Sequence, residues 1–257
     1  THSAKISIRE ISSDNIITLL NRLRKQIGSD RIIHMTFHGG EPLLCFSLIK
    51  DIIEVIEKNF INIVISIQTN GILISKEIVD YCTRKSIRIG VSLDGISFHD
   101  NIGRFGKEGK YLYNRVLNNI ELLIKSNIDF GILAVISKMN YESIYDFVKY
   151  FHTMGVKKFV LNPMLKLDGA DNEINTDVLL ENYLNLINYI DGVNNNICHP
   201  DDYISERGIT TIIHSLFLNK SQQCYSLPCG AAMNLLACDS NGDIYPCDVF
   251  FNNNDFI

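Results

Sequence analysis

The sequence predicts an α/β fold made of parallel strand–helix–strand units. Short apolar segments rich in β-branched residues recur along the chain, and between them apolar residues are spaced three and four positions apart. The first pattern is typical of strands buried on both faces, and the second of helices with one apolar face. Strands that alternate with helices form a parallel sheet, which either closes into a barrel or opens into a doubly wound sheet.

Five segments have the composition of strands: residues 32–37, 63–67, 87–93, 130–136 and 158–161. The helical spacing is carried by four sets of residues: Ile16, Leu19, Leu20 and Leu23; Ile49, Ile52, Ile53 and Ile56; Ile144, Phe147, Val148 and Phe151; and Leu180, Tyr183, Leu184 and Ile187. The first helix follows a capping serine, Ser12 or Ser13, and comes before the first strand. We therefore expect the strand that belongs before this helix to be missing, so that a barrel would lack its first strand.

The pattern changes at about Ser221 to turn-rich sequence with closely spaced cysteines. Ser240, Asn241 and Gly242 predict a hairpin turn between residues 235–238 and 244–245. We place a domain boundary here, which gives a first domain of residues 1–220 and the start of a second at 221–257.

Composition limits the classes of function. The chain has 257 residues, 46% of them hydrophobic, a net charge of −5 and no long basic run. Nucleic acid and anionic membranes are therefore not expected partners, and a small or peptidic substrate fits better. No segment has the length of a membrane span or the pattern of a signal peptide, so a cytoplasmic protein is expected. Because the chain begins at Thr1 without a methionine, we expect a fragment whose true start lies upstream.

The seven cysteines form two groups. Three are scattered, which predicts small buried hydrophobic side chains: Cys45, Cys82 and Cys198. Four crowd one short region, which suggests a metal site: Cys224, Cys229, Cys238 and Cys247.

In parallel α/β folds the ligand binds at the carboxyl ends of the strands, where this sequence has unusual residues. The first strand ends in His-Gly-Gly-Glu-Pro, residues 38–42. The glycines Gly39 and Gly40 let a ligand approach the backbone, and Pro42 leaves nearby carbonyls without a regular partner. Free carbonyl groups suit an ammonium group.

Polar residues also follow the next two strands. They are Gln68, Thr69, Asn70 and Gly71 after the second strand, and Ser92, Leu93, Asp94 and Gly95, with His99, Asp100 and Arg104 downstream, after the third. An arginine presents a planar fork to a carboxylate, so Ser92 and Arg104 are candidates to hold the acid end of an amino acid. Taken singly, each motif is also explained by a tight turn or a solvated charge.

Taken together, HGGEP, QTNG and SLDG with the downstream arginine resemble the radical S-adenosylmethionine (SAM) superfamily, particularly the anaerobic sulfatase-maturating enzymes and related maturases of ribosomal peptides. The resemblance runs from about Ile32 to Asp248. It implies a partial (β/α)6 TIM-like barrel whose first strand is missing, and SAM as a cofactor. The residues that it implies for SAM binding are Gly39, Gly40, Glu41, Pro42, Gln68, Asn70, Ser92, Arg104 and, in the stretch expected to pack on adenine, Leu165.

The cysteine-rich end resembles the opening of the SPASM auxiliary-cluster domain, because Cys229, twelve residues, Gly242, four residues and Cys247 follow its spacing. This implies [4Fe-4S] clusters with Cys224, Cys229 and Cys247 as ligands, and Cys238 as a weaker candidate. A small zinc site made by the same cysteines remains an alternative.

Asp248 directly follows Cys247. In the sulfatase-maturating enzymes an aspartate at this place is the base that deprotonates the substrate Ser or Cys, so the resemblance implies a catalytic Asp248. The alternative is that Asp248 only caps a turn.

The resemblance implies an oxidoreductase that modifies a peptide or protein side chain through a 5′-deoxyadenosyl radical, either by forming formylglycine in a sulfatase or by crosslinking a ribosomal peptide. A reductant such as flavodoxin or ferredoxin is the implied electron donor. The Cys-x-x-x-Cys-x-x-Cys motif that holds the SAM cluster is not in this sequence, and we expect it before Thr1. Two alternatives stay open: a degenerate homologue that only binds peptides, and a zinc-stabilised α/β enzyme unrelated to SAM.

Overall fold

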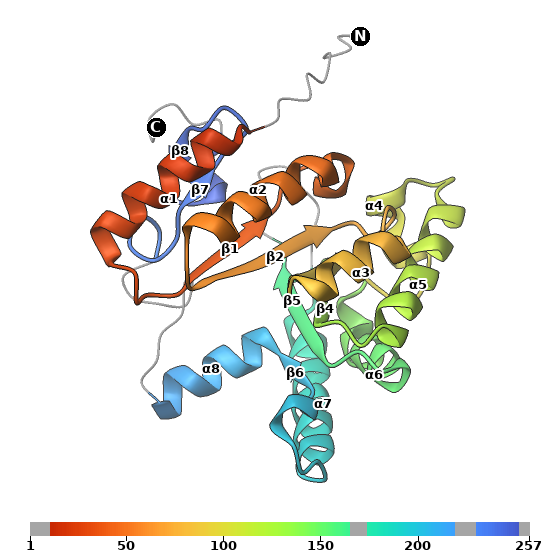
Figure 1. Ribbon diagram of the computed structural model, residues 1–257. Coiled ribbons are helices and arrows are strands. Elements are labelled where there is room, and N and C mark those ends of the chain that lie inside the picture. Colours follow the sequence, from red (N-terminus) through yellow and green to blue (C-terminus); the bar gives the residue numbers. More distant parts are fainter. Residues whose placement is uncertain (1–10, 165–173, 219–229, 252–257) are drawn as a thin grey trace. The chain divides into compact units, whose positions relative to one another are not determined.

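The computed structural model describes residues 11–164, 174–218 and 230–251, and its main element is a six-stranded sheet (Figure 1). The strands lie in chain order: β1 (Ile33–Phe37), β2 (Ile63–Thr69), β3 (Arg88–Ser92), β4 (Phe130–Ile136), β5 (Lys158–Pro163) and β6 (Ser205–Glu206). Every neighbouring pair from β2 to β6 is parallel. The predicted α/β class is confirmed. A strand order that never reverses is that of a partial barrel, since a doubly wound sheet has a reversal point.

Eight α-helices lie in the described ranges: α1 (Ser13–Ile27), α2 (Phe46–Asn59), α3 (Lys76–Arg84), α4 (Ile102–Phe105), α5 (Lys110–Lys125), α6 (Ile144–Met154), α7 (Thr176–Asn194) and α8 (Arg207–Leu218). Ser12 caps α1, because its hydroxyl oxygen accepts a hydrogen bond from the backbone N–H of Asn15 at 3.2 Å. The predicted helices around Ile49 and Ile144 are confirmed as α2 and α6, with their apolar faces buried.

The five predicted strands are all present, but β6 was missed. A strand of two residues, Ser205 and Glu206, has no periodicity that a sequence pattern could show. It pairs with the first residues of β5, Lys158 and Phe159, and is the edge strand of the described sheet on that side.

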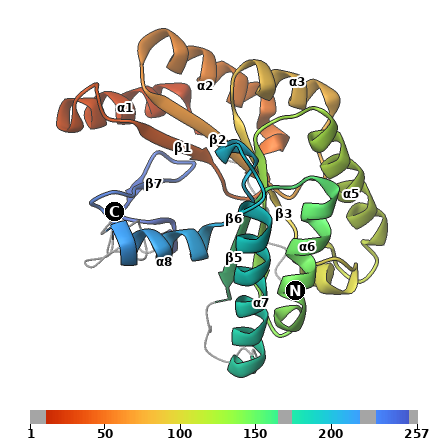
Figure 2. The ribbon, with the colours of Figure 1, turned by 90° about the horizontal axis from the view of Figure 1, so that it is seen from below.

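Helices α3, α5 and α6 lie along the outside of the strands (Figure 2). They bury apolar side chains against the sheet, among them Val79, Val116, Phe147 and Phe151, each at most 2% exposed. A fully buried side chain of this size contributes roughly 1.5–3 kcal/mol to folding. The rings of Phe147 and Phe159 meet edge to face with centroids 6.2 Å apart, which joins α6 to β5.

Helix α7 forms where its spacing predicts it, but much of its apolar stripe is exposed. Leu180, Leu184 and Ile187 are 57%, 52% and 40% exposed. The helix packs on α6 through Tyr189 instead, whose ring meets His152 with its hydroxyl group 2.7 Å from Nδ1. Apolar spacing predicts a helix, whereas the neighbour that covers it is decided by the fold.

The three scattered cysteines differ in how far they are buried. Cys82 is fully buried in α3, as predicted, and burial raises the pKa of its thiol to about 12. Cys45 is half-buried, and Cys198 is exposed, so the prediction of a buried side chain was wrong for Cys198.

By contacts the chain divides into two units, which are described separately. One contains Met35–Leu44 and Ile65–Ile213, and with them the carboxyl ends of β1 to β5. The other includes α1, α2 and the hairpin of β7 (Ala237–Cys238) with β8 (Ile244–Tyr245). The predicted hairpin turn is confirmed: the strands are antiparallel, and Gly242 has a φ of +90°. The predicted boundary at residue 221 lies outside the described residues.

Within the described ranges, the structure contains no helix that is both long and apolar enough to span a membrane.

Candidate functional site

The loop after β1 exposes its backbone. Gly39 has a φ of +100°, a conformation that favours glycine, and an added Cβ at Gly39 or Gly40 would meet no atom within 4 Å. The loop then enters the short 3-10 helix Pro42–Cys45. These glycines therefore leave open space beside the main chain, as predicted for the approach of a ligand.

The carboxylate of Glu41 binds the protein itself. Its Oε1 accepts hydrogen bonds from the Thr69 hydroxyl at 2.7 Å and the Leu43 N–H at 3.1 Å, and its Oε2 accepts one from the Asn70 N–H at 2.8 Å. Thr69 is 2% exposed, so this contact is sheltered from water. The side chain of Glu41 ties the glycine loop to the end of β2, a role that sequence reasoning missed.

Gln68 and Asn70, predicted to bind the cofactor, also have partners within the protein. Gln68 Nε2 donates a hydrogen bond to Ser92 Oγ at 2.9 Å, and Asn70 Oδ1 accepts one from the Ile72 N–H at 2.9 Å. Gln68 lies opposite Gly90 in the β2–β3 pair, where an added Cβ would come within 2.0 Å of Gln68 Oε1. Gly90 therefore provides the space that lets Gln68 reach Ser92.

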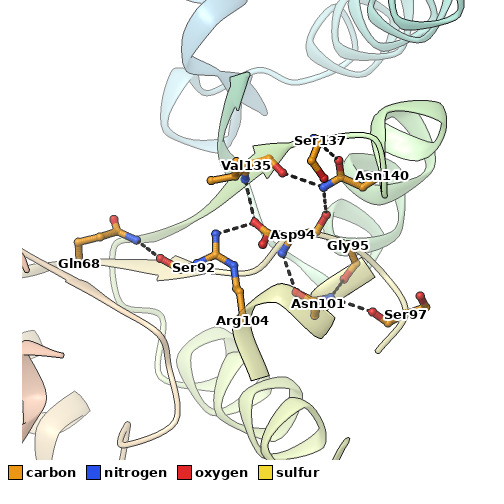
Figure 3. Close-up of polar contacts among 10 residues, drawn as sticks. All are labelled: Gln68, Ser92, Asp94, Gly95, Ser97, Asn101, Arg104, Val135, Ser137 and Asn140. Atoms are coloured by element: carbon orange, nitrogen blue, oxygen red, sulfur yellow. Dashed lines mark hydrogen bonds and ion pairs between the residues drawn. The ribbon is translucent and has the colours of Figure 1, made fainter. Parts of the chain in front are cut away.

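Arg104 comes from α4 and points at the carboxylate of Asp94, just after β3 (Figure 3). Arg104 Nη2 lies 2.5 Å from Asp94 Oδ1, and their side chains are only 21% and 15% exposed. The same oxygen accepts a hydrogen bond from the Val135 N–H on β4 at 2.8 Å. Arg104 Nε is buried and has no hydrogen-bond partner among the described residues. It is a donor that a bound acceptor can satisfy.

Two buried asparagines hold this loop. Asn101, fully buried, accepts a hydrogen bond from the Asp94 N–H at 2.7 Å through its side-chain oxygen. Asn140, 3% exposed, donates from Nδ2 to the carbonyl oxygen of Asp94 at 2.6 Å. Sequence reasoning singled out the neighbouring His99 and Asp100 and missed both asparagines. The available signal was an asparagine in the turn after β3 and another after β4.

Glu206 is a further residue that sequence reasoning missed. It is 1% exposed, and its carboxylate accepts hydrogen bonds from the Leu161 N–H on β5 at 3.0 Å and the Ile209 N–H in the first turn of α8 at 2.8 Å. It thereby fixes the end of β5, where the adenine-packing stretch was predicted. Leu165, the predicted contact in that stretch, lies outside the described residues.

Two of the predicted metal ligands, Cys224 and Cys229, also lie outside the described residues. In the hairpin unit, burial raises the pKa of Cys238, with smaller contributions from Asp239 and Asp243. The described part of the chain contains no cluster of three or more His, Cys, Asp or Glu side chains placed to hold a metal. The ligand set therefore stays a prediction.

Asp248 opens a 3-10 helix, Asp248–Phe250, and is exposed. Its Oδ1 accepts a hydrogen bond from Cys247 Sγ at 3.0 Å. The predicted catalytic role of Asp248 also stays a prediction.

The arrangement at the strand ends suits a zwitterion, such as the amino-acid end of SAM. Arg104 offers a guanidinium group with a buried donor that has no partner among the described residues, and Ser92 offers a hydroxyl group at the end of β3. The open backbone at Gly39 and Gly40 offers space and polar main-chain groups. These residues fit a ligand with one carboxylate and one ammonium group.

Comparison with known proteins agrees with this fold. A model of the family described as the radical SAM superfamily matches residues 2–151. An uncharacterized protein of Methanocaldococcus jannaschii is 35% identical over 142 residues, which cover 54% of this chain and 49% of that protein. A cysteine-type anaerobic sulfatase-maturating enzyme of Clostridium novyi is 26% identical over 261 residues, covering 94% of this chain and 67% of the enzyme.

Among solved structures, native anSMEcpe with bound AdoMet and Kp18Cys peptide superimposes with a TM-score of 0.74 at 22% identity, covering 94% of this chain and 67% of that one. At this identity the likeness shows the fold. The chain spans about half to two thirds of the length of the curated relatives that it matches.

Proposed function

The chain belongs to the radical SAM superfamily, and on this premise we propose that the protein oxidatively modifies a side chain of a peptide or protein substrate. The observation that carries the proposal is the buried Nε of Arg104, which has no partner in the described residues and lies in a site that also offers Ser92. Bound SAM would supply the 5′-deoxyadenosyl radical that takes a hydrogen atom from the substrate.

In this proposal the residues of the chain hold SAM by its two charged groups. Arg104 and Ser92 bind the carboxylate, because a guanidinium group and a hydroxyl group both donate to it. The backbone around Gly40 accepts the ammonium group. Glu41 and Gln68 act indirectly. The side chain of Glu41 holds the glycine loop, and that of Gln68 holds Ser92. Leu165 is proposed to pack on adenine.

The hairpin unit is proposed to start a domain that carries auxiliary [4Fe-4S] clusters. Cys224, Cys229 and Cys247 are the proposed ligands, because thiolates are what such clusters require. Asp248 is the proposed base, since an exposed carboxylate beside a cluster ligand can accept the proton of a substrate thiol or hydroxyl group. A small one-electron carrier protein, flavodoxin or ferredoxin, is the proposed reductant.

The proposed substrate is a cysteine or serine in a sulfatase, with crosslinking of a ribosomal peptide as the alternative reaction. What supports the first is the relative from Clostridium novyi, which is named a cysteine-type anaerobic sulfatase-maturating enzyme.

The test is to incubate the intact, anaerobically reconstituted protein, including the residues encoded before Thr1, with SAM, a reductant and a peptide that carries a sulfatase motif. Formation of 5′-deoxyadenosine together with conversion of the cysteine or serine to an aldehyde, seen by mass spectrometry, is the expected result. Formation of 5′-deoxyadenosine without any change in the peptide would exclude the sulfatase substrate.

A second candidate is a peptide-binding protein without catalysis. It differs from the enzyme in one feature, the Cys-x-x-x-Cys-x-x-Cys motif, which is not among the 257 residues of this sequence. The residues encoded before Thr1 separate the two candidates: if they hold that motif, the enzyme is supported, and if they do not, the binding protein is.

A further inference from the structure

We propose that Asp94 is a positioning residue, which fixes the guanidinium group of Arg104 in the orientation that grips the carboxylate of SAM. This inference rests on the proposed function, in which Arg104 holds that carboxylate. It goes beyond the proposed function by giving a role to Asp94, an acidic side chain to which that function assigns none.

The first argument is the geometry of the ion pair. Asp94 Oδ1 lies 2.5 Å from Arg104 Nη2 and accepts a second hydrogen bond, at 2.8 Å, from the backbone N–H of Val135. An ion pair between exposed, mobile side chains fixes little. Here the acid is held to the main chain of β4, so it can impose its own position on the arginine (Figure 3).

The second argument is that the main chain of Asp94 is held on both sides. The side chain of Asn101 accepts a hydrogen bond from the N–H of Asp94, and the side chain of Asn140 donates one to the carbonyl oxygen of Asp94. Both asparagines have further bonds that fix them in turn. Asn101 Nδ2 donates to the carbonyl oxygen of Gly95 at 3.0 Å, and Asn140 Oδ1 accepts from the Ser137 N–H at 2.8 Å. The carboxylate of Asp94 is therefore not free to follow a moving arginine.

The third argument is that the ion pair leaves donors of Arg104 available for a ligand. An arginine carries five N–H donors in a rigid fork, and of those of Arg104 only one, on Nη2, donates to Asp94 in the described structure. Nε is buried without a partner in the described residues, which is costly unless another acceptor arrives. Asp94 thus holds one nitrogen of the fork and leaves Nε for a ligand.

Charge gives the fourth argument. Arg104 alone would attract any carboxylate, whereas the Asp94 carboxylate already balances its charge and occupies one direction of approach. The ion pair therefore favours a ligand whose carboxylate reaches the Arg104 donors that Asp94 leaves free. It disfavours a ligand that must also bind the Nη2 donor already held by Asp94.

The test measures binding of SAM and of decarboxylated SAM to the anaerobically purified protein by titration calorimetry. Asp94→Asn is expected to weaken SAM binding by about tenfold or more and to leave decarboxylated SAM unchanged, because only SAM has the carboxylate that Arg104 holds. In the double variant with Arg104→Lys, the loss is expected to be no larger than that of Arg104→Lys alone, since Asp94 acts through Arg104.

Asp129→Asn is the matched control. Like Asp94, Asp129 forms ion pairs, here with Arg88 and Lys158. These residues lie at the amino ends of β3, β4 and β5, opposite the proposed SAM site, so the affinities for SAM and decarboxylated SAM are expected to stay unchanged. If Asp94→Asn does not fold, as shown by its thermal unfolding, Asp94→Glu replaces it. That variant keeps the charge but displaces it by one methylene group, and it is expected to show the same selective loss.

Equal weakening of both ligands by the Asp94 variant, or no weakening of either, would overturn the positioning role. If the unaltered protein binds neither ligand, the proposed function fails and this inference fails with it. The two failures are distinguishable because the second appears in the unaltered protein.

Discussion

The backbone N–H of Asn70 donates a hydrogen bond to the carboxylate of Glu41 at 2.8 Å, which joins the end of β2 to the loop after β1. Because the other oxygen of this carboxylate accepts from the buried Thr69 hydroxyl, both ends of the group are occupied by the protein. The glycine loop is thus held in place by an acid that lies within a sequence motif expected to bind the cofactor.

Glu41→Gln is expected to lower the free energy of unfolding by about 1–3 kcal/mol, because an amide NH2 group would face a donor that now has an acceptor. Urea denaturation measures this. The control is Glu121→Gln on α5, whose exposed carboxylate pairs with Lys125 in the next turn, and which is expected to change stability by less than about 0.5 kcal/mol. Equal effects of the two variants would contradict the anchoring role of Glu41.

Gly90→Ala is expected to weaken SAM binding about three- to tenfold, because its Cβ would displace the Gln68 amide that now donates to Ser92. Calorimetric titration with SAM is the measurement. Gly192→Ala in α7 adds the same methyl group where no atom lies within 4 Å, and it should leave binding unchanged. Unaltered affinity in Gly90→Ala would show that Gln68 does not prepare Ser92 for the ligand.

The partial burial of His152 makes stability depend on pH. Burial lowers the pKa of His152 below its ordinary 6.5, so the unfolded chain takes up this proton more readily than the folded one. The stability that the neutral ring contributes is therefore fully present above pH 6.5 and is lost as the pH falls towards the lower folded-state pKa.

Chemical denaturation at pH 8 and at about pH 5 measures this difference. His152→Gln is expected to lose less stability on acidification than the unaltered protein does. The exposed His34 on β1 provides the control, since His34→Gln is expected to keep the full dependence. A pH dependence that survives in His152→Gln would assign it to other groups.

Asp248→Asn is expected to reduce product formation on a sulfatase-motif peptide about 100-fold or more, and to leave SAM binding unchanged, if Asp248 is the base. Mass spectrometry of the peptide and calorimetry with SAM measure the two effects. Asp243→Asn removes a carboxylate from the hairpin that precedes Asp248 and should keep activity. If Asp248→Asn is as active as this control, the aspartate only begins a turn.

The secondary structure was largely predictable because it depends on local spacing. Helices α2 and α6 and strand β4 lie where their apolar patterns place them. The apolar pattern did not predict β6, because a strand of two residues has no period. It also did not show how α7 packs, since much of the apolar stripe of this helix is exposed.

The sequence by itself determined the α/β class, the family motifs and the polar residues at the strand ends, because a motif is a property of neighbouring residues. Only the tertiary structure decided what each polar group binds. Glu41 meets Asn70 and Asp94 meets Val135 across 29 and 41 positions of the chain. No local pattern specifies such contacts, since they exist only when parallel strands bring their carboxyl ends to one edge of the sheet.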